Sequence, residues 1–406
     1  MNKKVLIIGG GFAGIKTARQ LDKISGESLD ITLISNKDYF EYYPALYRLV
    51  TGTSPIEACV PLTEMLFDTN VQTIKDAIIS IDPNTKTVVG ASGTTYTADY
   101  LILALGSETA YFDLPGLSEL SFGFKSVNEA LKLKQHIHNL FVDHVQTSVS
   151  ESVSHFHIVI VGGGASGVEI AGDLVSFLKT LTTSHEVDPS LITIDLIESA
   201  PRLLQNINPK VSARVEKRLR SIGVNIYLNR SLVKEEVEEV YLKDMSLRSK
   251  TVVWTAGTRV NKLYATIPGF IFNKKGKVSV DSHLQPVSFN GVYVIGDAAD
   301  TPYSGLAQTA IYDGTYIAKT IMNDVHGVKT KEYKPKATSY SIPVGDNWGV
   351  LSIGKFQFYG YIPYIIRHVI DFMFFSGIVS ARKLFSMYRE GWKYRKIDKS
   401  CKNCNI

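Results

Sequence analysis

The sequence predicts an α/β protein in which one chain carries two similar nucleotide-binding units. A short apolar run, Val5 to Ile8, leads into three consecutive glycines, and a helical pattern and a second apolar run, Ile31 to Ile34, follow. The same order begins again with the apolar run Phe156 to Val161. Recurrence at this spacing indicates domain duplication, and 406 residues are too many for one compact core.

Composition excludes several classes of protein. The chain is 45% hydrophobic and 20% charged, as expected of a folded globular protein, and its net charge of +5 is too small to indicate nucleic-acid binding. Its three cysteines, Cys59, Cys401 and Cys404, are too few for a disulfide-stabilised secreted protein. We expect no signal peptide, because the short apolar run after Met1 meets a glycine-rich turn and no small-residue cleavage site. We expect no spanning helix either, because no uninterrupted apolar run reaches about 20 residues.

The other elements are predicted from apolar runs that end at turn residues and from one capping pattern. Ser126 and Glu129 are spaced as in a capping box, which predicts that a helix begins there. In chain order the remaining predictions are a strand at Tyr100–Leu105, a linker at Leu114–Gly116, a helix at Val168–Leu178, strands at Leu191–Ile197, Val252–Trp254 and Gly291–Ile295, and a helix from Ala307.

Both glycine-rich turns match Gly-x-Gly-x-x-Gly after a strand and before a helix, which is the context of a dinucleotide site. The first glycine allows a tight turn, the second lets a pyrophosphate approach the backbone, and the third lets helix and strand pack closely. Free N–H groups at the helix N-terminus then attract the pyrophosphate. The matching residues are Gly9, Gly11 and Gly14 in the first unit and Gly162, Gly164 and Gly167 in the second.

The residue at the end of the second strand indicates which nucleotide each unit binds. In the second unit it is Glu198, whose carboxylate can bind both ribose hydroxyls and would repel a 2′-phosphate, so NADH is favoured over NADPH. Arg202 lies close by, so the preference is not absolute. In the first unit the corresponding position is Ser35, followed by Asn36 and Lys37, and the serine and asparagine can still hydrogen-bond a ribose.

Three further segments resemble the two-dinucleotide-binding flavoproteins: Leu101–Gly106, Val252–Gly257 and Gly291–Asp297. This resemblance implies two Rossmann-like domains, with FAD in the first and NADH in the second, and it implies that Asp297 binds a ribityl hydroxyl of FAD. The implied organisation is a discontinuous FAD domain at 1–112 and 286–330, an NAD(H) domain at 113–285, and a C-terminal membrane-docking region at 331–406.

The resemblance also implies which residues contact each cofactor. For NADH they are Gly162, Gly164, Gly167, Glu198 and Gly257. No metal site is expected, because the nine histidines form no metal-ligand pattern. For FAD the implied contacts are Gly9, Gly10, Gly11, Phe12, Ala13, Gly14, Ser35, Asn36, Lys37, Pro44, Ile78, Ala104, Leu105, Gly106, Asp297, Leu306 and Ala307.

The chain resembles the type II NADH:quinone oxidoreductases in three places, which are Tyr42–Arg48 with Gly52, Trp254–Asn261, and Ala307–Ala310 with Gly314. The resemblance implies that Gln308 lines the quinone pocket and that Glu169 lies near the nicotinamide and the flavin. The alternative for Gln308 is an ordinary N-terminal helix residue, and for Glu169 a carboxylate stabilised by the helix dipole alone. Many members carry a second glutamine four residues after the first, whereas this chain has Tyr312.

The implied activity is FAD-dependent NADH:quinone oxidoreduction without proton pumping, in which a hydride passes from NADH to FAD and two electrons then pass to a membrane quinone. Two alternatives remain open, a soluble reductase with a protein acceptor and a flavin sensor similar to apoptosis-inducing factor. Disulfide reductases and sulfide:quinone reductases use cysteines beside the flavin, and Cys59 alone supports neither chemistry. Cys401 and Cys404 are interpreted as part of a tail, with a redox or intermolecular metal role as the alternative.

The C-terminal region mixes apolar, aromatic and basic side chains. Ile362, Ile365, Val369 and Met373 recur near helical spacing, and basic residues follow from Arg382 onward. This composition suits a helix that lies on an anionic membrane surface. We therefore expect a peripheral enzyme on the cytoplasmic face of the cell membrane. A helix packed on the protein core, or a homodimer interface, is the alternative.

Overall fold

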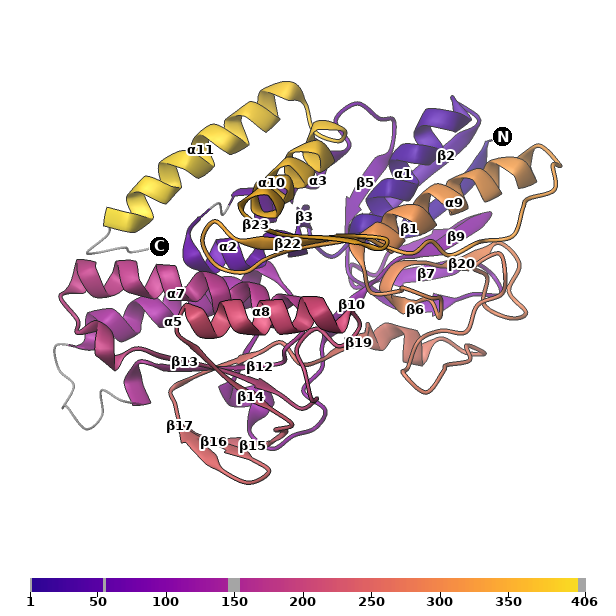
Figure 1. Cartoon of the computed structure of the whole chain (residues 1–406). Helices are drawn as coiled ribbons and strands as arrows, with labels where there is room; N and C mark the ends of the chain where they lie inside the picture. The colour runs from indigo at the N-terminus through magenta and orange to yellow at the C-terminus, as the bar shows by residue number, and fades with distance from the viewer. Residues whose placement is uncertain (1, 54–55, 145–153, 401–406) are drawn as a thin grey trace.

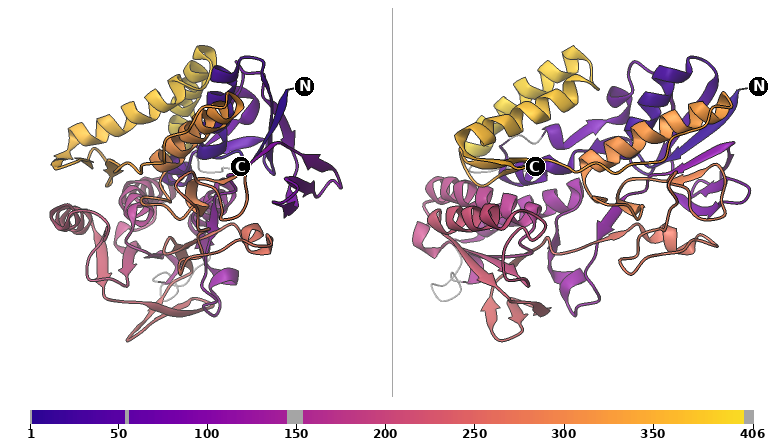
Figure 2. Two further views of the ribbon diagram at one scale, coloured as in Figure 1. Left: turned by 90° about the vertical axis from the view of Figure 1, so that its right-hand side faces the viewer. Right: turned by 45° about the vertical axis from the view of Figure 1, so that its right-hand side comes forward.

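The computed structural model describes residues 2–53, 56–144 and 154–400, so Cys401 and Cys404 lie outside the described residues. Figure 1 shows two α/β units, with helices α10 (Tyr361–Ser376) and α11 (Ala381–Ser400) along one side of the molecule. Figure 2 shows these helices at the same end as α1 (Phe12–Ser25) and α9 (Ala307–Val325). The predicted α/β fold class is confirmed.

The first unit is built on a parallel sheet with the strand order β20-β9-β1-β2-β5. In the central strand, Ile7 pairs with both Leu33 and Ile102. The middle strands are buried on both faces, which explains their continuous apolar runs. The bounds are β1 (Lys3–Ile8), β2 (Leu29–Ser35), β5 (Gln72–Lys75), β9 (Tyr100–Leu103) and β20 (Val292–Val294).

Two glycines allow helices α1 and α9 to pack closely. A Cβ at Gly14 would lie 1.9 Å from the carbonyl oxygen of Gly9, and one at Gly314 would lie 2.7 Å from that of Ala13. Any larger side chain would push α1 away from the turn before it or push α9 away from α1. Glycine at these two positions therefore positions both helix N-termini beside the same cavity.

The second unit repeats this architecture with the strand order β11-β18-β12-β13-β14. Its central strand β12 lies between β13 and β18, all three running parallel. The bounds are β11 (Phe122–Gly123), β12 (His157–Val161), β13 (Thr193–Glu198), β14 (Val224–Leu228) and β18 (Thr251–Trp254), with helices α5 (Val127–Asp143), α7 (Ala165–His185) and α8 (Pro209–Ser221).

The chain crosses between the units twice, and the two crossings are hydrogen-bonded to each other. Strand β10 (Ser107–Thr109) pairs antiparallel with β19 (Thr258–Val260). Directly after β19, Tyr264 and Ile267 pack with the core on one face of the first sheet. From the sequence, we predicted that the chain returns to the FAD domain at residue 286. Because Tyr264 and Ile267 already pack against the first sheet, we propose that the boundary lies near Asn261.

Smaller elements surround the two sheets. Short 3₁₀ helices are Tyr43–Ala45, Ile56–Ala58, Pro189–Leu191, Lys262–Thr266 and Gly296–Ala298. The remaining strands are β3 (Tyr39–Glu41), β4 (Cys59–Pro61), β6 (Ile78–Asp82), β7 (Thr87–Gly90), β8 (Thr95–Thr97), β15 (Leu232–Glu236), β16 (Glu239–Leu242), β17 (Ser246–Arg248), β21 (Tyr340–Pro343), β22 (Gly349–Ile353) and β23 (Phe356–Gly360), and the short helices are α2 (Leu46–Thr51), α3 (Leu62–Met65) and α4 (Leu117–Leu120).

Two local predictions need adjustment. Helix α5 does begin after Ser126, whose hydroxyl accepts a hydrogen bond from the Glu129 N–H at 3.2 Å. The Glu129 carboxylate, however, accepts from the Lys125 N–H at 2.8 Å, so the reciprocal half of the capping box is shifted by one residue. Strand β23 was not expected from a region with few strand features after Leu351. It forms because it adds an edge strand to β22.

Candidate functional site

A cavity of about 700 Å³ begins at the first glycine-rich turn and reaches helix α10. Every predicted FAD contact except Gly14 lines it, together with the predicted catalytic residues Glu169 and Gln308. Gly14 instead packs against Gly9. The cavity therefore brings together residues from both units and from the C-terminal region.

The first glycine-rich turn has the geometry that a pyrophosphate needs. Gly9 has a φ of +116°, which favours glycine, and a Cβ there would lie 2.3 Å from the Ala104 carbonyl oxygen. Gly11 is the N-cap of α1 without a side-chain cap, and a Cβ there would meet no atom within 4 Å. Open space thus lies before uncapped N–H groups, so these residues fit the FAD that the sequence resemblance implies.

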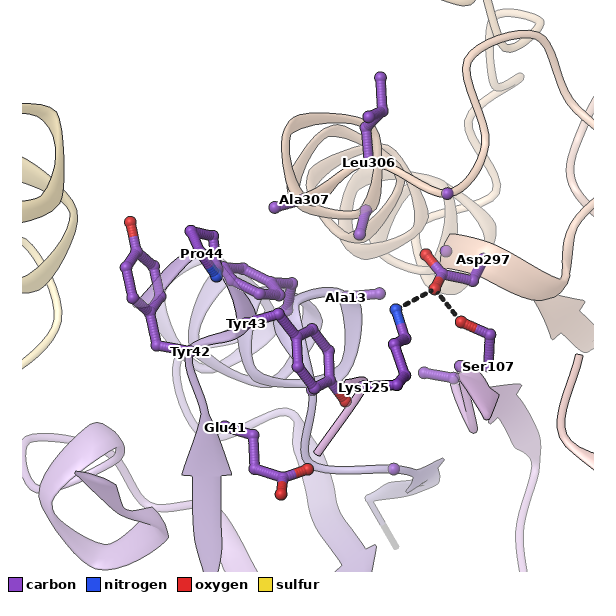
Figure 3. A pocket seen from close by; sticks show the side chains of 18 of the residues that line it. Ala13, Glu41, Tyr42, Tyr43, Pro44, Ser107, Lys125, Asp297, Leu306 and Ala307 are labelled. Carbon is purple, nitrogen blue, oxygen red and sulfur yellow. Dashed lines mark hydrogen bonds and ion pairs between the residues drawn. The ribbon is translucent and has the colours of Figure 1, made fainter. Parts of the chain in front are cut away.

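A charged cluster lies in the middle of the cavity (Figure 3). The Asp297 carboxylate accepts a short hydrogen bond from Ser107 and forms an ion pair with Lys125 at 3.3 Å. The Lys125 ammonium also lies 4.5 Å from the centre of the Tyr43 ring. Burial acts to raise the pKa of Asp297, but Lys125 and Ser107 outweigh burial and hold that pKa below its usual value.

The strand-end position of the first unit is occupied by a hydroxyl. Ser35 Oγ accepts a hydrogen bond from the Lys37 N–H at 3.2 Å, and the Lys37 ammonium pairs with Glu41 at 2.6 Å. Glu41 in turn accepts from the N–H of Val127 at the start of α5 at 2.9 Å. A carboxylate that the sequence did not single out therefore lines the cavity, six residues beyond the strand end.

The second unit has the nucleotide geometry that its glycines predict. A Cβ at Gly167 would lie 1.8 Å from the Gly162 carbonyl oxygen, as at the corresponding positions of the first unit. Glu198 accepts hydrogen bonds from the N–H groups of Gly163 at 2.6 Å and Ala200 at 2.8 Å. These bonds hold the carboxylate beside the glycine-rich turn, where the ribose hydroxyls of a dinucleotide would bind.

Arg202 is engaged within its own loop. Its guanidinium donates to the carbonyl oxygens of Leu204 at 3.1 Å and Ile207 at 2.9 Å, and also to that of Gln205. Three of its five N–H donors are thus used within the loop, which fixes the direction of the guanidinium. Arg202, which made the predicted preference for NADH less strict, therefore stabilises its own loop.

A second cavity of about 270 Å³ adjoins the first, and Ser107, Lys125, Ser166 and Asp297 line both. Gly257, the remaining predicted NADH contact, lines only this smaller cavity. The exposed Phe112 ring packs against Gly257, since a Cβ there would lie 2.2 Å from the ring.

Glu169 lies on the second turn of α7, beyond the first turn that the sequence suggested, and it faces a buried arginine. The Glu169 carboxylate pairs with the Arg367 guanidinium of α10 at 3.3 Å, and their side chains are only 12% and 8% exposed. Burial raises the pKa of Glu169 to about 7, although Arg367 opposes that shift. Arg367 also donates to the carbonyl oxygens of Pro44 at 2.6 Å and Ser341 at 2.7 Å. It thereby ties α10 to three segments of the cavity wall.

The Glu169–Arg367 pair belongs to a larger buried charge network. Asp371 pairs with Arg367 at 3.2 Å and with Arg48, and it accepts from the Tyr42 hydroxyl at 2.6 Å. Arg48 pairs in turn with Glu57 at 3.0 Å. Sequence reasoning assigned no role to Arg367 and Asp371, although their i, i+4 spacing was an available signal for a shared inward face.

Gln308 lines the cavity, but its amide is paired with the backbone. Its Nε2 donates to the Ser339 carbonyl oxygen at 3.1 Å, and its Oε1 accepts from the Ser339 N–H at 3.2 Å. This pairing clamps α9 to the segment before β21. Tyr312, where a second glutamine was expected, lies outside the cavity lining, and the Lys336 ammonium lies 4.5 Å from its ring centre.

Helix α10 presents an apolar face to solvent opposite its buried charges. Ile362 is 71% exposed and Met373 is 65% exposed, and Ile365, Val369 and Phe372 are also exposed. No helix within the described ranges has the length and apolarity to cross a bilayer. Within those ranges, too, no group of three or more His, Cys, Asp or Glu side chains could hold a metal ion, and Cys59 is a free, half-buried thiol.

Comparisons with known proteins agree with this geometry. Residues 3–314 match the family model described as pyridine nucleotide-disulphide oxidoreductase. A type II NADH:quinone oxidoreductase of Staphylococcus saprophyticus is 29% identical over 364 residues, which cover 86% of this chain and 90% of that protein.

Two solved structures share the fold along nearly the whole chain. The structure of NDH2 from Plasmodium falciparum in complex with NADH has a TM-score of 0.88 at 16% identity, covering 98% of this chain and 99% of that chain. The sulfide:quinone oxidoreductase of Aquifex aeolicus has a TM-score of 0.78 at 20% identity, covering 99% and 98%. The similarity of fold therefore includes the C-terminal helices.

Proposed function

Because the chain belongs to the pyridine nucleotide-disulphide oxidoreductase family, we propose that it is an FAD-dependent NADH:quinone oxidoreductase that does not pump protons. One observation carries this proposal: a single cavity joins the FAD cradle of the first unit, Glu169 of the second unit and helix α10. Bound FAD would supply the chemistry, since it can take a hydride from NADH and pass two electrons to an acceptor.

The two units divide the nucleotides between them. The first unit holds FAD, with Gly9 making the tight turn, Gly11 leaving room for the pyrophosphate and Asp297 binding the ribityl chain. The second unit holds NADH, with Glu198 binding the ribose and Gly164 leaving room at the start of α7. Gly162 and Gly167 allow the turn and the helix to pack closely. Because the Glu198 carboxylate would repel a 2′-phosphate and Arg202 is engaged by carbonyl groups, NADH is preferred over NADPH.

The end of the cavity at α10 receives the quinone. Ile370 and Phe374 of α10 and Ile311 of α9 line it with apolar side chains, and the Gln308 amide holds its wall in place. Reducing a quinone to a quinol consumes two electrons and two protons. Glu169, with a pKa raised to about 7 by burial, can hold a proton at this end of the cavity at neutral pH.

Helix α10 docks the enzyme on the membrane that contains the quinone, at its cytoplasmic face. Its exposed stripe of Ile362, Ile365, Val369 and Met373 would insert at the level of the lipid headgroups, and its opposite face supplies Arg367 and Asp371 to the site. One helix therefore contacts both the lipid and the cavity, which shortens the path of a membrane-embedded quinone to the flavin.

Anaerobic stopped-flow mixing tests the proposal. Purified protein with a measured FAD content is mixed with NADH or NADPH, flavin bleaching is followed, and a water-soluble quinone is then added. We expect faster bleaching by NADH and recovery of the flavin absorbance by quinone. Bleaching by NADPH alone would contradict the assignment of Glu198, and a flavin that stays bleached after quinone addition would contradict the acceptor.

A further inference from the structure

We infer that Lys125 sets the reduction potential of the bound flavin, by keeping a fixed positive charge in the cavity where negative charge accumulates. This inference rests on the FAD site of the proposed function and on no assumption about the acceptor. It concerns a residue of the second unit, between β11 and α5, and not a residue of either glycine-rich turn.

The position of Lys125 is fixed by its neighbours. Its N–H donates to Glu129 at 2.8 Å, and Ser126 caps the helix that follows. Its ammonium is held between the Asp297 carboxylate at 3.3 Å and the Tyr43 ring at 4.5 Å. With 22% of its side chain exposed, Lys125 lies where the two cavities meet, and Figure 3 shows it pointing toward Asp297.

The charge balance of the cavity explains why this ammonium matters. A hydride carries two electrons and one proton, so each transfer to the cofactor adds one negative charge to the cavity until a further proton arrives. The carboxylates of Asp297, Glu41 and Glu129 already line this region, and the cations that line the same cavity are Lys37, Lys125 and Arg367. Lys37 is paired with Glu41, and Arg367 with Glu169 and Asp371. Lys125 is thus the cation in contact with Asp297, and Lys277 of the smaller cavity adds a weaker charge effect on that carboxylate.

Removing this charge should make reduction of the flavin harder. Without Lys125, the largely buried Asp297 carboxylate keeps only Ser107 as a hydrogen-bond donor among its described neighbours, and its field would oppose the added negative charge. An arginine at position 125 would keep the charge, whereas a glutamine would keep polarity and length without it.

The test measures the midpoint potential of bound FAD by spectroscopic equilibration with reference dyes at neutral pH. For Lys125→Gln we expect the equilibrium constant for two-electron reduction to fall at least tenfold, which corresponds to about 30 mV. Lys125→Arg should stay near wild type. Lys275→Gln is the matched control, because Lys275 lines only the smaller cavity. It should leave the potential unchanged.

Several outcomes separate this inference from the proposed function. A wild-type protein that binds no FAD would refute the proposed function itself. If Lys125→Gln binds FAD and its potential equals that of wild type, the inference is wrong even though the proposed function stands. Should Lys125→Gln bind FAD too weakly to titrate, Asp297→Asn provides the opposite test: with Lys125 unopposed, its potential should rise, and an unchanged or lower value would overturn the inference.

Discussion

At the scale of single residues, the two catalytic candidates depend on partners that lie far away in the chain. Glu169 is 198 positions from Arg367, yet their side chains form a buried pair. Gln308 is 31 positions from Ser339, and its amide is committed to that backbone. We therefore interpret Glu169 as the group that holds a proton and Gln308 as a positioning residue for the cavity wall.

Glu169→Gln should weaken the dependence of stability on pH. Burial raises the folded-state pKa of Glu169 to about 7 from the ordinary 4.5, so the folded protein binds this proton more tightly than the unfolded chain. Its contribution is complete below pH 4.5 and is lost as pH rises through 7, amounting to roughly 3 kcal/mol by linkage. Urea unfolding at pH 5 and pH 8 would measure the loss in wild type and its reduction in the variant.

Comparing Glu169→Gln with wild type isolates the contribution of Glu169 to the pH dependence of stability. Burial also raises the pKa of Glu235 to about 8 and that of Asp313 to about 6, so other groups contribute to the same pH range. Both remain in the variant and cancel in the difference. Equal pH slopes in the two proteins would show that Glu169 has an ordinary pKa.

Glu198→Gln should narrow the preference for NADH. The variant loses a charged hydrogen-bond acceptor for the ribose, worth about 1.5–3 kcal/mol, so kcat/KM for NADH should fall about tenfold or more. It also loses the repulsion between the Glu198 carboxylate and the 2′-phosphate of NADPH. Steady-state rates with both nucleotides measure the ratio. Arg202→Ala is the control: it should lower the melting temperature, because its carbonyl contacts are lost, without shifting that ratio.

At the scale of elements, α10 is the helix to which we assign two tasks, completing the site and docking on the membrane. Its buried face carries Arg367 and Asp371, and burial alone would raise the pKa of Asp371, but Arg48 and Arg367 outweigh burial and hold that pKa low. Its other face is apolar and exposed. Because the charges lie inside, the docking function can be tested on exposed residues alone without disturbing the site.

Ile362→Glu combined with Met373→Glu should abolish vesicle binding while sparing catalysis. Both side chains are more than 60% exposed, so the folded protein should tolerate them, whereas a lipid interface should reject the charges. Co-sedimentation with anionic vesicles measures binding, and turnover with a water-soluble quinone should stay within about twofold of wild type.

Val237→Glu is the matched control for the docking variant. Val237 is 78% exposed in the turn between β15 and β16, at the opposite end of the molecule from α10 (Figures 1 and 2). It adds one negative charge, as each substitution of the docking variant does, at an equally exposed apolar position, and should not affect sedimentation. Loss of vesicle binding in both variants would point to net charge and not to α10 as the cause.

At the scale of the whole molecule, the C-terminal region is part of the site and cannot be removed as a separate anchor. A chain that ends at Gly354 would lose β23, α10 and α11, and with them Arg367 and Asp371. Glu169 and Arg48 would then be left without their α10 partners. The region thus completes the wall of a cavity that both nucleotide-binding units begin.

Ending the chain at Gly354 should therefore abolish turnover even with a water-soluble quinone. A buried charge that loses its partner costs about 3–5 kcal/mol, and the exposed core should also reduce solubility. FAD content, melting temperature and soluble-quinone turnover would be measured against the full chain. Full activity of the shortened protein would mean that the buried charge network does not support the site.

Local patterns were sufficient to predict both glycine-rich turns, the strands before them and the helices after them. A strand buried on both faces requires a continuous apolar run, and a tight turn with φ near +115° requires glycine at Gly9 and Gly162. Such requirements act over a few residues, so the amino-acid order alone determined them. The duplication of the nucleotide-binding unit and the acidic residue Glu198 at a strand end were likewise predicted from the amino-acid order.

Only the tertiary structure decided what the isolated charges do. Lys125 beside Asp297, Arg367 beside Glu169, and Arg48 beside Asp371 are pairs whose members lie far apart in the sequence. From the sequence alone, a single charged residue is expected to be exposed to solvent. Its burial and its counter-charge arise only when the chain folds. The physical reason is that burial is a property of the assembled molecule, and the low dielectric that gives these pairs their effect exists only after the two units and α10 have closed around the cavity.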